Sequence, residues 1–141
     1  MLRVVRGLPG SGKTHKAKEI AAGTGSYHFE TDMFWMENGV YRFDHSRIKL
    51  AHAWCYDITR RCLIEEKDVI VSNTFVEWKY IEPYFEMSKD LNSGFEIIEP
   101  ETPWAVSASL CHGMCTHAVP YDVIANMAVK WERTEDLCVT L

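Results

Sequence analysis

The sequence has no long hydrophobic run, and no apolar stretch approaches the roughly 18 residues that a membrane-spanning helix needs. Internal repeats and low-complexity linkers are also missing. Hydrophobic residues make up 47% of the chain and charged residues 25%, as in ordinary globular proteins. The N-terminus leads directly into a predicted strand, which leaves no room for a signal peptide. We therefore expect a cytoplasmic protein without membrane contact, folded as one domain over residues 1–141.

Positive charge is scarce as well. Lys and Arg number 15 against 20 Asp and Glu, for a net charge of −5, and neither Lys nor Arg occurs between Lys89 and Lys130. This balance argues against a broad basic surface for nucleic acid. It leaves open a short strand held by a few local arginines.

The five cysteines do not suggest a disulfide framework, because an odd count in a cytoplasmic protein is typical of reduced thiols. One group of thiols and imidazoles is close together in the sequence: Cys111, His112, Cys115 and His117. Its spacing fits no standard pair of zinc ligands, and no partner cluster occurs elsewhere. We expect packing of a lid or of the core here, with a metal site as the lesser alternative.

One motif stands out from this background, a match to the phosphate-binding pattern G-x-x-x-x-G-K-[ST]. It consists of Gly7, Leu8, Pro9, Gly10, Ser11, Gly12, Lys13 and Thr14. An apolar run at residues 2–5 precedes it and suits a buried strand, and helix-forming residues follow it to Gly23. Strand, glycine-rich turn and helix form the context in which backbone N–H groups and a helix N-terminus cradle phosphate. We predict a nucleotide site for ATP or another NTP, with Lys13 on the β- and γ-phosphates and Thr14 on Mg²⁺.

The remaining chain alternates between predicted strands and helices, which favours an α/β fold with a parallel sheet covered on both faces. Strands are predicted at residues 27–30, 69–71 and 95–99. Helices are predicted from 44 or 45 to 62, at 77–91, at 106–114 and at 120–131. Asn38 and Gly39 indicate a hairpin turn, and Pro83 predicts a kink or a restart of its helix. Residues 137–141 suit either an edge strand or a frayed end.

Asp32 is the strongest further candidate, because it follows the second strand on the side where ligands bind in open α/β sheets. Its carboxylate suits a general base near the γ-phosphate, a second-shell position around Mg²⁺, or a simple helix or turn cap. Ser72 and Asn73 follow the next strand at its C-terminal end, where they would bond a Mg²⁺-bound water, a phosphate or only the backbone. The aromatic group of Phe34, Trp35, Tyr41 and Phe43 suits either base stacking or a small core.

These residues together resemble the polynucleotide-kinase-like P-loop proteins. The similarity begins at Arg6–Thr14, continues through Thr31-Asp32, and includes Glu99-Pro100-Glu101-Thr102-Pro103-Trp104 and the segment 117–120. It is greatest to the small ATP-binding domain of animal ubiquitin-ligase-binding P-loop proteins and their phage and bacterial relatives. The resemblance implies a three-layer P-loop kinase fold with sheet order 2-3-1-4, or 2-3-1-4-5 with one more strand. It also implies Mg²⁺, ATP and transfer of the γ-phosphoryl group to a hydroxyl, with Asp32 as base.

Three positions depart from the pattern of that family. Trp35 stands where a substrate-binding arginine is usual, Met114 where the lid carries an arginine, and Ser72-Asn73 where an acid ends the third strand. Loss of a charge-stabilising arginine can reduce the rate on the order of 10³-fold or more. Arg42 or Arg47 would substitute from the other side of the cleft.

Two functions therefore follow from the sequence. One is an ATP-dependent kinase acting on a nucleic-acid 5′-hydroxyl or a small nucleotide, with Lys13 and Asp32 in the reaction and Arg42, Arg47 and Asn73 near the substrate. The other is a nucleotide-binding module, weakened as a catalyst, that binds or inhibits a partner protein.

Overall fold

The fold is built on four parallel strands, as seen in a computed structural model that describes residues 1–116 and 118–137. The strands are β1 (Leu2–Arg6), β2 (Tyr27–Phe29), β5 (Val69–Asn73) and β6 (Phe95–Ile98). They lie in the order β2-β5-β1-β6, and every pairing among them is parallel. Counted along the chain, this is the order 2-3-1-4 that the resemblance implies. The residues of a further strand, 138–141, lie outside the described part.

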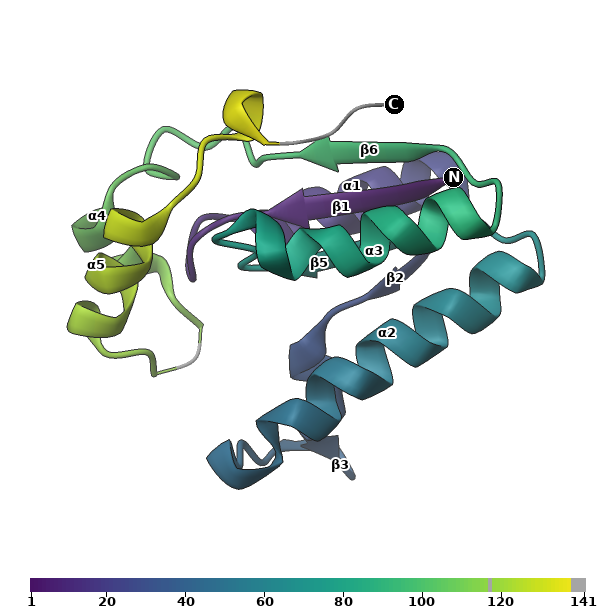
Figure 1. Ribbon diagram of the computed structural model, residues 1–141. Helices are drawn as coiled ribbons and strands as arrows, with labels where there is room; N and C mark the ends of the chain where they lie inside the picture. The colour runs from purple at the N-terminus through teal and green to yellow at the C-terminus, as the bar shows by residue number, and fades with distance from the viewer. Residues whose placement is uncertain (117, 138–141) are drawn as a thin grey trace.

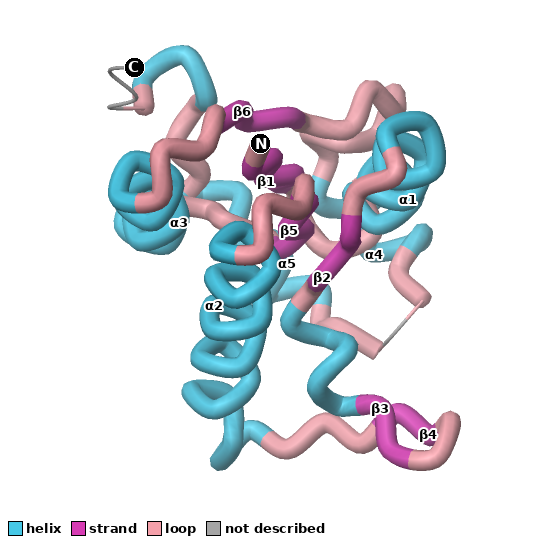
Figure 2. Tube along the Cα trace, turned by 90° about the vertical axis from the view of Figure 1, so that its right-hand side faces the viewer, coloured by secondary structure: helices cyan, strands magenta, loops and turns pink. Residues whose placement is uncertain are grey.

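Three helices cover the two faces of this sheet, as Figures 1 and 2 show from two directions. Side chains alternate along β1, so that Leu2 and Val4 join one core and Val5 joins the other. Helix α1 (Lys13–Thr24) packs on the Val5 face. Helices α2 (Ile48–Ile64) and α3 (Trp78–Asp90) pack on the opposite face. The predicted three-layer arrangement is confirmed.

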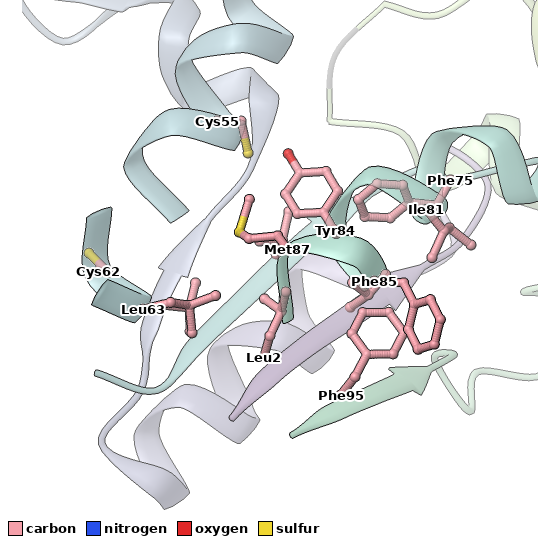
Figure 3. Packing of buried hydrophobic residues seen from close by; sticks show 13 residues of the cluster. Leu2, Cys55, Cys62, Leu63, Phe75, Ile81, Tyr84, Phe85, Met87 and Phe95 are labelled. Carbon is pink, nitrogen blue, oxygen red and sulfur yellow. The ribbon is translucent and has the colours of Figure 1, made fainter. Parts of the chain in front are cut away.

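The larger core lies between the sheet and the pair α2 and α3, and Figure 3 shows it at close range. Cys55 and Cys62 are buried on the α2 side of this core, as the spacing of the apolar residues in the sequence predicts. Ring contacts link its aromatic side chains, including Phe85 with Phe95 at 5.2 Å between centroids. Both cysteines therefore serve packing.

The sequence predicts a kink or a restart of the helix at Pro83, and of these two the restart is wrong. Helix α3 continues from Trp78 to Asp90 with Pro83 in its second turn. Proline removes one donor, the bond to the carbonyl of Lys79, but both residues are exposed, so water can reach that carbonyl. Tyr84 and Phe85, buried directly after the proline, hold the helix on the core.

A hairpin leaves the sheet after β2. A 3₁₀ turn at Thr31–Trp35 leads into β3 (Met36–Glu37), which pairs with β4 (Val40–Tyr41). Asn38 and Gly39 connect the two strands with φ values of 50° and 79°, as the sequence predicts for this turn. Trp35 is only 2% exposed and makes edge contacts with Phe34 and Phe43. Trp35 therefore has a core role, one of the two roles expected for this group, while Phe43 is 53% exposed.

Two short helices lie beyond the carboxyl ends of the strands (Figure 1). They are α4 (Ala108–Met114) and α5 (Tyr121–Lys130), and they pack on each other and on Leu8 through Cys111 and Ile124. A last 3₁₀ turn covers Thr134–Asp136. Within the described residues, no helix is both long and apolar enough to cross a bilayer.

Candidate active site

The glycine-rich loop leaves β1 at the carboxyl edge of the sheet and turns directly into α1. Gly7 donates its N–H to the carbonyl of Thr74, which ties the loop to the end of β5. Helix α1 has no side-chain cap at Gly12, and its first N–H groups have no carbonyl within the helix to bond. The loop thus presents free donors at a helix N-terminus, the arrangement that binds phosphate oxygens.

Two positions in this loop require glycine. Gly10 has a φ of 79°, and a Cβ there would lie 2.0 Å from the carbonyl oxygen of Cys111. Gly12 has a φ of 96°, and a Cβ there would lie 3.0 Å from the methyl group of Thr102. Any larger residue would be strained at both points and would push α4 and the segment before it away from the loop.

The segment between β6 and α4 holds the loop from outside. The Thr102 hydroxyl donates to the Ser11 carbonyl at 2.6 Å, and Trp104 Nε1 donates to the Gly10 carbonyl at 2.9 Å. Because C=O and N–H point in opposite directions in a trans peptide, the bond to Ser11 turns the N–H of Gly12 away from Thr102. Thr102 and Trp104 belong to the segment that carried the family resemblance, and the structure shows what they contact.

Lys13 is the first residue of α1 and is half-buried. Burial lowers the pKa of its ammonium group, and the carboxylates of Asp32 and Glu30 oppose part of this effect. A buried cation among free N–H groups attracts an anion, as expected of the lysine in this motif.

A chain of hydrogen bonds connects the loop to β2 and β5. Thr14 Oγ1 donates to Glu30 Oε2 at 2.8 Å, and Ser72 Oγ donates to the same oxygen at 3.1 Å. His28 Nε2 lies 2.7 Å from Ser72 Oγ. Burial lowers the pKa of His28, partly opposed by Glu30, which favours a neutral ring that donates to the serine.

Glu30 is the residue that the sequence reasoning missed. The sequence pattern places Glu30 at the end of a predicted strand and favours Asp32 as the general base. The signal available was its position one residue beyond β2, at the same sheet edge as the phosphate loop.

Asp32 lies in the 3₁₀ turn after β2 and is exposed. Tyr41 donates its hydroxyl to Asp32 Oδ1 at 3.3 Å, and burial together with Asp32 raises the pKa of Tyr41 to about 12. The residue at the cap position of this turn is Glu30, and no side chain caps it. Asp32 therefore does not cap this turn, and its carboxylate is close enough to Lys13 to influence the pKa of the ammonium group.

The other candidates occupy different surroundings. Asn73 Oδ1 accepts the backbone N–H of Thr31 at 2.9 Å, which orders the turn that carries Asp32. Arg42 forms an ion pair with Glu37 at 3.8 Å, and the Arg47 guanidinium lies 5.1 Å from the Phe34 ring centroid. These contacts hold both arginines on the hairpin side of the cleft.

A cavity of about 890 Å³ opens beside this edge of the sheet. Its walls come from α2, the end of β5 with the loop after it, α3 and α5. Aromatic side chains line much of it, namely Tyr56, Phe75, Tyr80 and Tyr84. His52 belongs to its rim and lies 3.5 Å from the hydroxyl of Thr31, so the cavity borders the turn that carries Asp32.

Comparison with known proteins assigns this architecture to a family. The profile of a family described as an AAA domain matches residues 2–113, which include the phosphate loop and every strand of the sheet. The chain belongs to this family.

Solved structures that share this fold include a kinase. A chain in the structure of the Pnkp1/Rnl/Hen1 RNA repair complex superposes with a TM-score of 0.72 at 16% identity, over 92% of this chain and 43% of that one. A gluconokinase from Sinorhizobium meliloti 1021 superposes with a TM-score of 0.61 at 19% identity, over 95% and 76%. At these identities the likeness is one of fold. The fold is that of the P-loop kinases.

Human NEDD4-binding protein 2 is 27% identical over 135 residues. The match covers 94% of this chain and 8% of the human protein, so the chain spans a small part of that relative's length.

The donors at the site fit a magnesium nucleotide. No group of three or more His, Cys, Asp and Glu within residues 1–116 and 118–137 is placed to hold a metal ion unaided. Mg²⁺ in phosphoryl-transfer sites is held by one or two protein oxygens, the substrate phosphates and water. The Thr14 hydroxyl beside the free N–H groups of α1 suits this mode. His117, from the thiol and imidazole group, lies outside the described residues.

Proposed function

We propose that this domain binds ATP with Mg²⁺ and transfers the γ-phosphoryl group to a hydroxyl on a nucleic-acid 5′ end or a small nucleotide. The observation that carries the proposal is the position of Asp32. Its carboxylate influences the pKa of Lys13 in the phosphate loop, while its own turn borders the large cavity. A base beside the phosphate cradle, on a turn that borders a cavity for the acceptor, is what in-line phosphoryl transfer requires.

The residues of the loop would bind the donor. The N–H groups at the start of α1 and the Lys13 ammonium would hold the β- and γ-phosphates, and the Thr14 hydroxyl would hold Mg²⁺. When bound, the ion would neutralise charge that develops on the transferred group. Asn73 would act indirectly, because its bond to the Thr31 N–H orders the turn that carries Asp32.

In the transfer step, Asp32 would accept the proton of the acceptor hydroxyl. The hydroxyl oxygen then forms a bond to the γ-phosphorus, and the bond between that phosphorus and the β–γ bridging oxygen breaks. ADP leaves with the electron pair, the product is a phosphomonoester, and the proton remains on Asp32. Tyr41, which donates to Asp32 at 3.3 Å, would orient the carboxylate for this transfer.

The cavity supports an acceptor that carries an aromatic base. Its tyrosines offer flat apolar surfaces, and Lys79 and Lys130 lie at its wall as cations for a phosphate. Arg42 and Arg47 would reach the acceptor or the transferred group only by leaving their contacts on the hairpin.

A second function is favoured by a different observation. Neither Lys nor Arg occurs between Lys89 and Lys130, so the described part of α4 and the segments on either side bring no arginine to the transition state. A human relative is named for binding NEDD4. A domain that binds nucleotide and uses its fold to engage a partner protein would show both features.

A transfer assay distinguishes these functions. Protein is incubated with Mg²⁺ and γ-labelled ATP, together with 5′-hydroxyl DNA, 5′-hydroxyl RNA or single nucleosides and nucleotides. Kinase function predicts label in one class of acceptor and none with Lys13→Ala. Tight binding of ATP without transfer to any acceptor would exclude the kinase and support the partner-binding module. Absence of a thermal shift with any nucleotide would exclude both.

A further inference from the structure

We infer that Glu30 is the acid that orients magnesium in this site, in place of the acid that the end of β5 lacks. The inference rests on the proposed binding of a magnesium nucleotide. In P-loop proteins the ion is held by the loop Ser or Thr and by an acid from a neighbouring strand. Strand β5 ends here in Ser72 and Asn73, neither of which carries a charge.

The register of the sheet explains how Glu30 reaches this place. Strand β2 pairs with β5 so that Phe29 lies opposite Val71. Glu30 is the next residue, and its carboxylate extends to Ser72 on the neighbouring strand and to Thr14 at the loop. The negative charge has therefore moved one strand outward, while its oxygen still lies beside the Thr14 hydroxyl.

The direction of the Thr14 hydroxyl bond is the central observation. A hydroxyl has one proton and two lone pairs, and Thr14 uses its proton on Glu30 at 2.8 Å. The lone pairs of Thr14 Oγ1 are thereby turned away from Glu30 and remain available to a cation. A neutral residue in place of Glu30 would hold this orientation less firmly and would remove a charge beside the ion.

The partners of Glu30 fix its rotamer. Ser72 donates to the same carboxylate oxygen as Thr14, and His28 supports Ser72 from the other side at 2.7 Å. The Glu30 side chain is 17% exposed and that of His28 is 8% exposed. Such buried outer partners typically change metal affinity by about 10- to 100-fold when they are removed.

The test measures how strongly magnesium favours nucleotide binding. The dissociation constant of ATP is determined by calorimetry in excess Mg²⁺ and in EDTA, for wild type, Glu30→Gln and Glu101→Gln. Glu101 is the matched control, because it is an exposed acid that pairs with Lys16 of α1, and its replacement by Gln removes the same charge. Mn²⁺ binding in the presence of ATP, followed by electron paramagnetic resonance, gives a readout that does not depend on turnover.

The ratio compared is the dissociation constant of ATP in EDTA divided by that in excess Mg²⁺. In Glu30→Gln this ratio should fall about 10-fold or more, with weaker Mn²⁺ binding, while Glu101→Gln keeps the wild-type ratio. The affinity in EDTA should stay equal or rise, because a negative charge near the phosphates is gone. An unchanged ratio in Glu30→Gln would overturn the role of Glu30 and leave nucleotide binding intact. Wild type that binds no ATP would instead refute the proposed function.

Ser72→Ala keeps the charge and serves if Glu30→Gln fails to fold. It removes one of the two bonds that fix Glu30 and should reduce the same ratio by a smaller factor, about threefold for a bond of roughly 0.5–1 kcal/mol. A ratio equal to that of wild type in Ser72→Ala would contradict the inference.

Discussion

At the scale of one residue, burial of the Lys13 charge lowers the stability of the folded protein and favours the binding of an anion. Its ammonium group is half-buried and its pKa is lowered by that burial, so the charged form is less favourable in the folded protein than in the unfolded chain. A bound phosphate would make the charged form of Lys13 favourable again. The loop is therefore prepared for an anion before one arrives.

Replacing Lys13 with Met should weaken ATP binding by about 10- to 100-fold, the value of one or two charge-assisted hydrogen bonds. The protein without nucleotide should be as stable as wild type or more stable near neutral pH. Since the folded pKa lies below the roughly 10.4 of an exposed lysine, the unfolded chain binds more protons just below that pH. The wild-type free energy of unfolding should thus gain on that of Lys13→Met as pH rises through this window.

Calorimetry and urea titrations at several pH values measure both effects. Lys18→Met is the control, because Lys18 is exposed on the same helix. A variant of Lys13 that is clearly less stable than wild type without nucleotide would contradict the view that burial strains this charge.

The contacts of Glu30 could not be predicted from the sequence, whereas the phosphate loop could. The pattern around Gly7–Thr14 predicts the loop, because its chemistry is encoded in eight adjacent residues. The partners Glu30 and Ser72 are 42 residues apart, and their contact depends on which strands pair and in which register. Such a pairing is a property of the folded sheet, so the acid could not be assigned from local pattern.

At the scale of elements, the order of strands and helices was predictable, because each follows from a local pattern of apolar residues. The ends of strands were less predictable, since β5 continues beyond the predicted residues 69–71 and includes Ser72 and Asn73. The helix does not restart at Pro83, because water can reach the exposed carbonyl that loses its donor, while Tyr84 and Phe85 hold the helix on the core. Tertiary packing outweighed the local penalty of proline.

The segment between β6 and α4 acts as a brace for the phosphate loop. Thr102→Val should weaken ATP binding about fivefold, because it removes one hydrogen bond worth roughly 1 kcal/mol that orients the Gly12 N–H. Thr102→Ser keeps the hydroxyl and should bind like wild type. Titration with a fluorescent ATP analogue measures the difference. Equal affinity of the valine and serine variants would show that the brace does not position the loop.

At the scale of the whole molecule, Arg6 joins the ends of the fold. It is fully buried directly before the phosphate loop and donates to the carbonyls of Phe75 and Val76 at 3.1 and 2.9 Å. It also donates to Thr134 at 3.1 Å and lies 3.9 Å from the Trp131 ring centroid. Burial lowers its pKa, opposed by Glu99, Glu132 and Glu135. One side chain thus connects β1, the loop after β5 and the C-terminal segment.

Arg6→Met should lower the free energy of unfolding by about 3 kcal/mol or more, because two buried carbonyls lose donors that are charged. Urea unfolding measures the loss, and Arg133→Met, at a side chain 71% exposed, is the matched control. Amide exchange should increase in residues 131–137 of the Arg6 variant. A loss no larger than that of the control would mean that Arg6 does not hold these segments together.

The most direct test of phosphoryl transfer separates binding from chemistry in Asp32→Asn. ATP affinity is measured by calorimetry, and a single turnover with γ-labelled ATP and a 5′-hydroxyl acceptor is followed by rapid quench. A general base at Asp32 predicts ATP affinity within about threefold of wild type. It also predicts a transfer rate lower by roughly 10²- to 10⁴-fold. Transfer by Asp32→Asn at the wild-type rate would contradict this role, and so would a wild type that binds ATP tightly and transfers nothing.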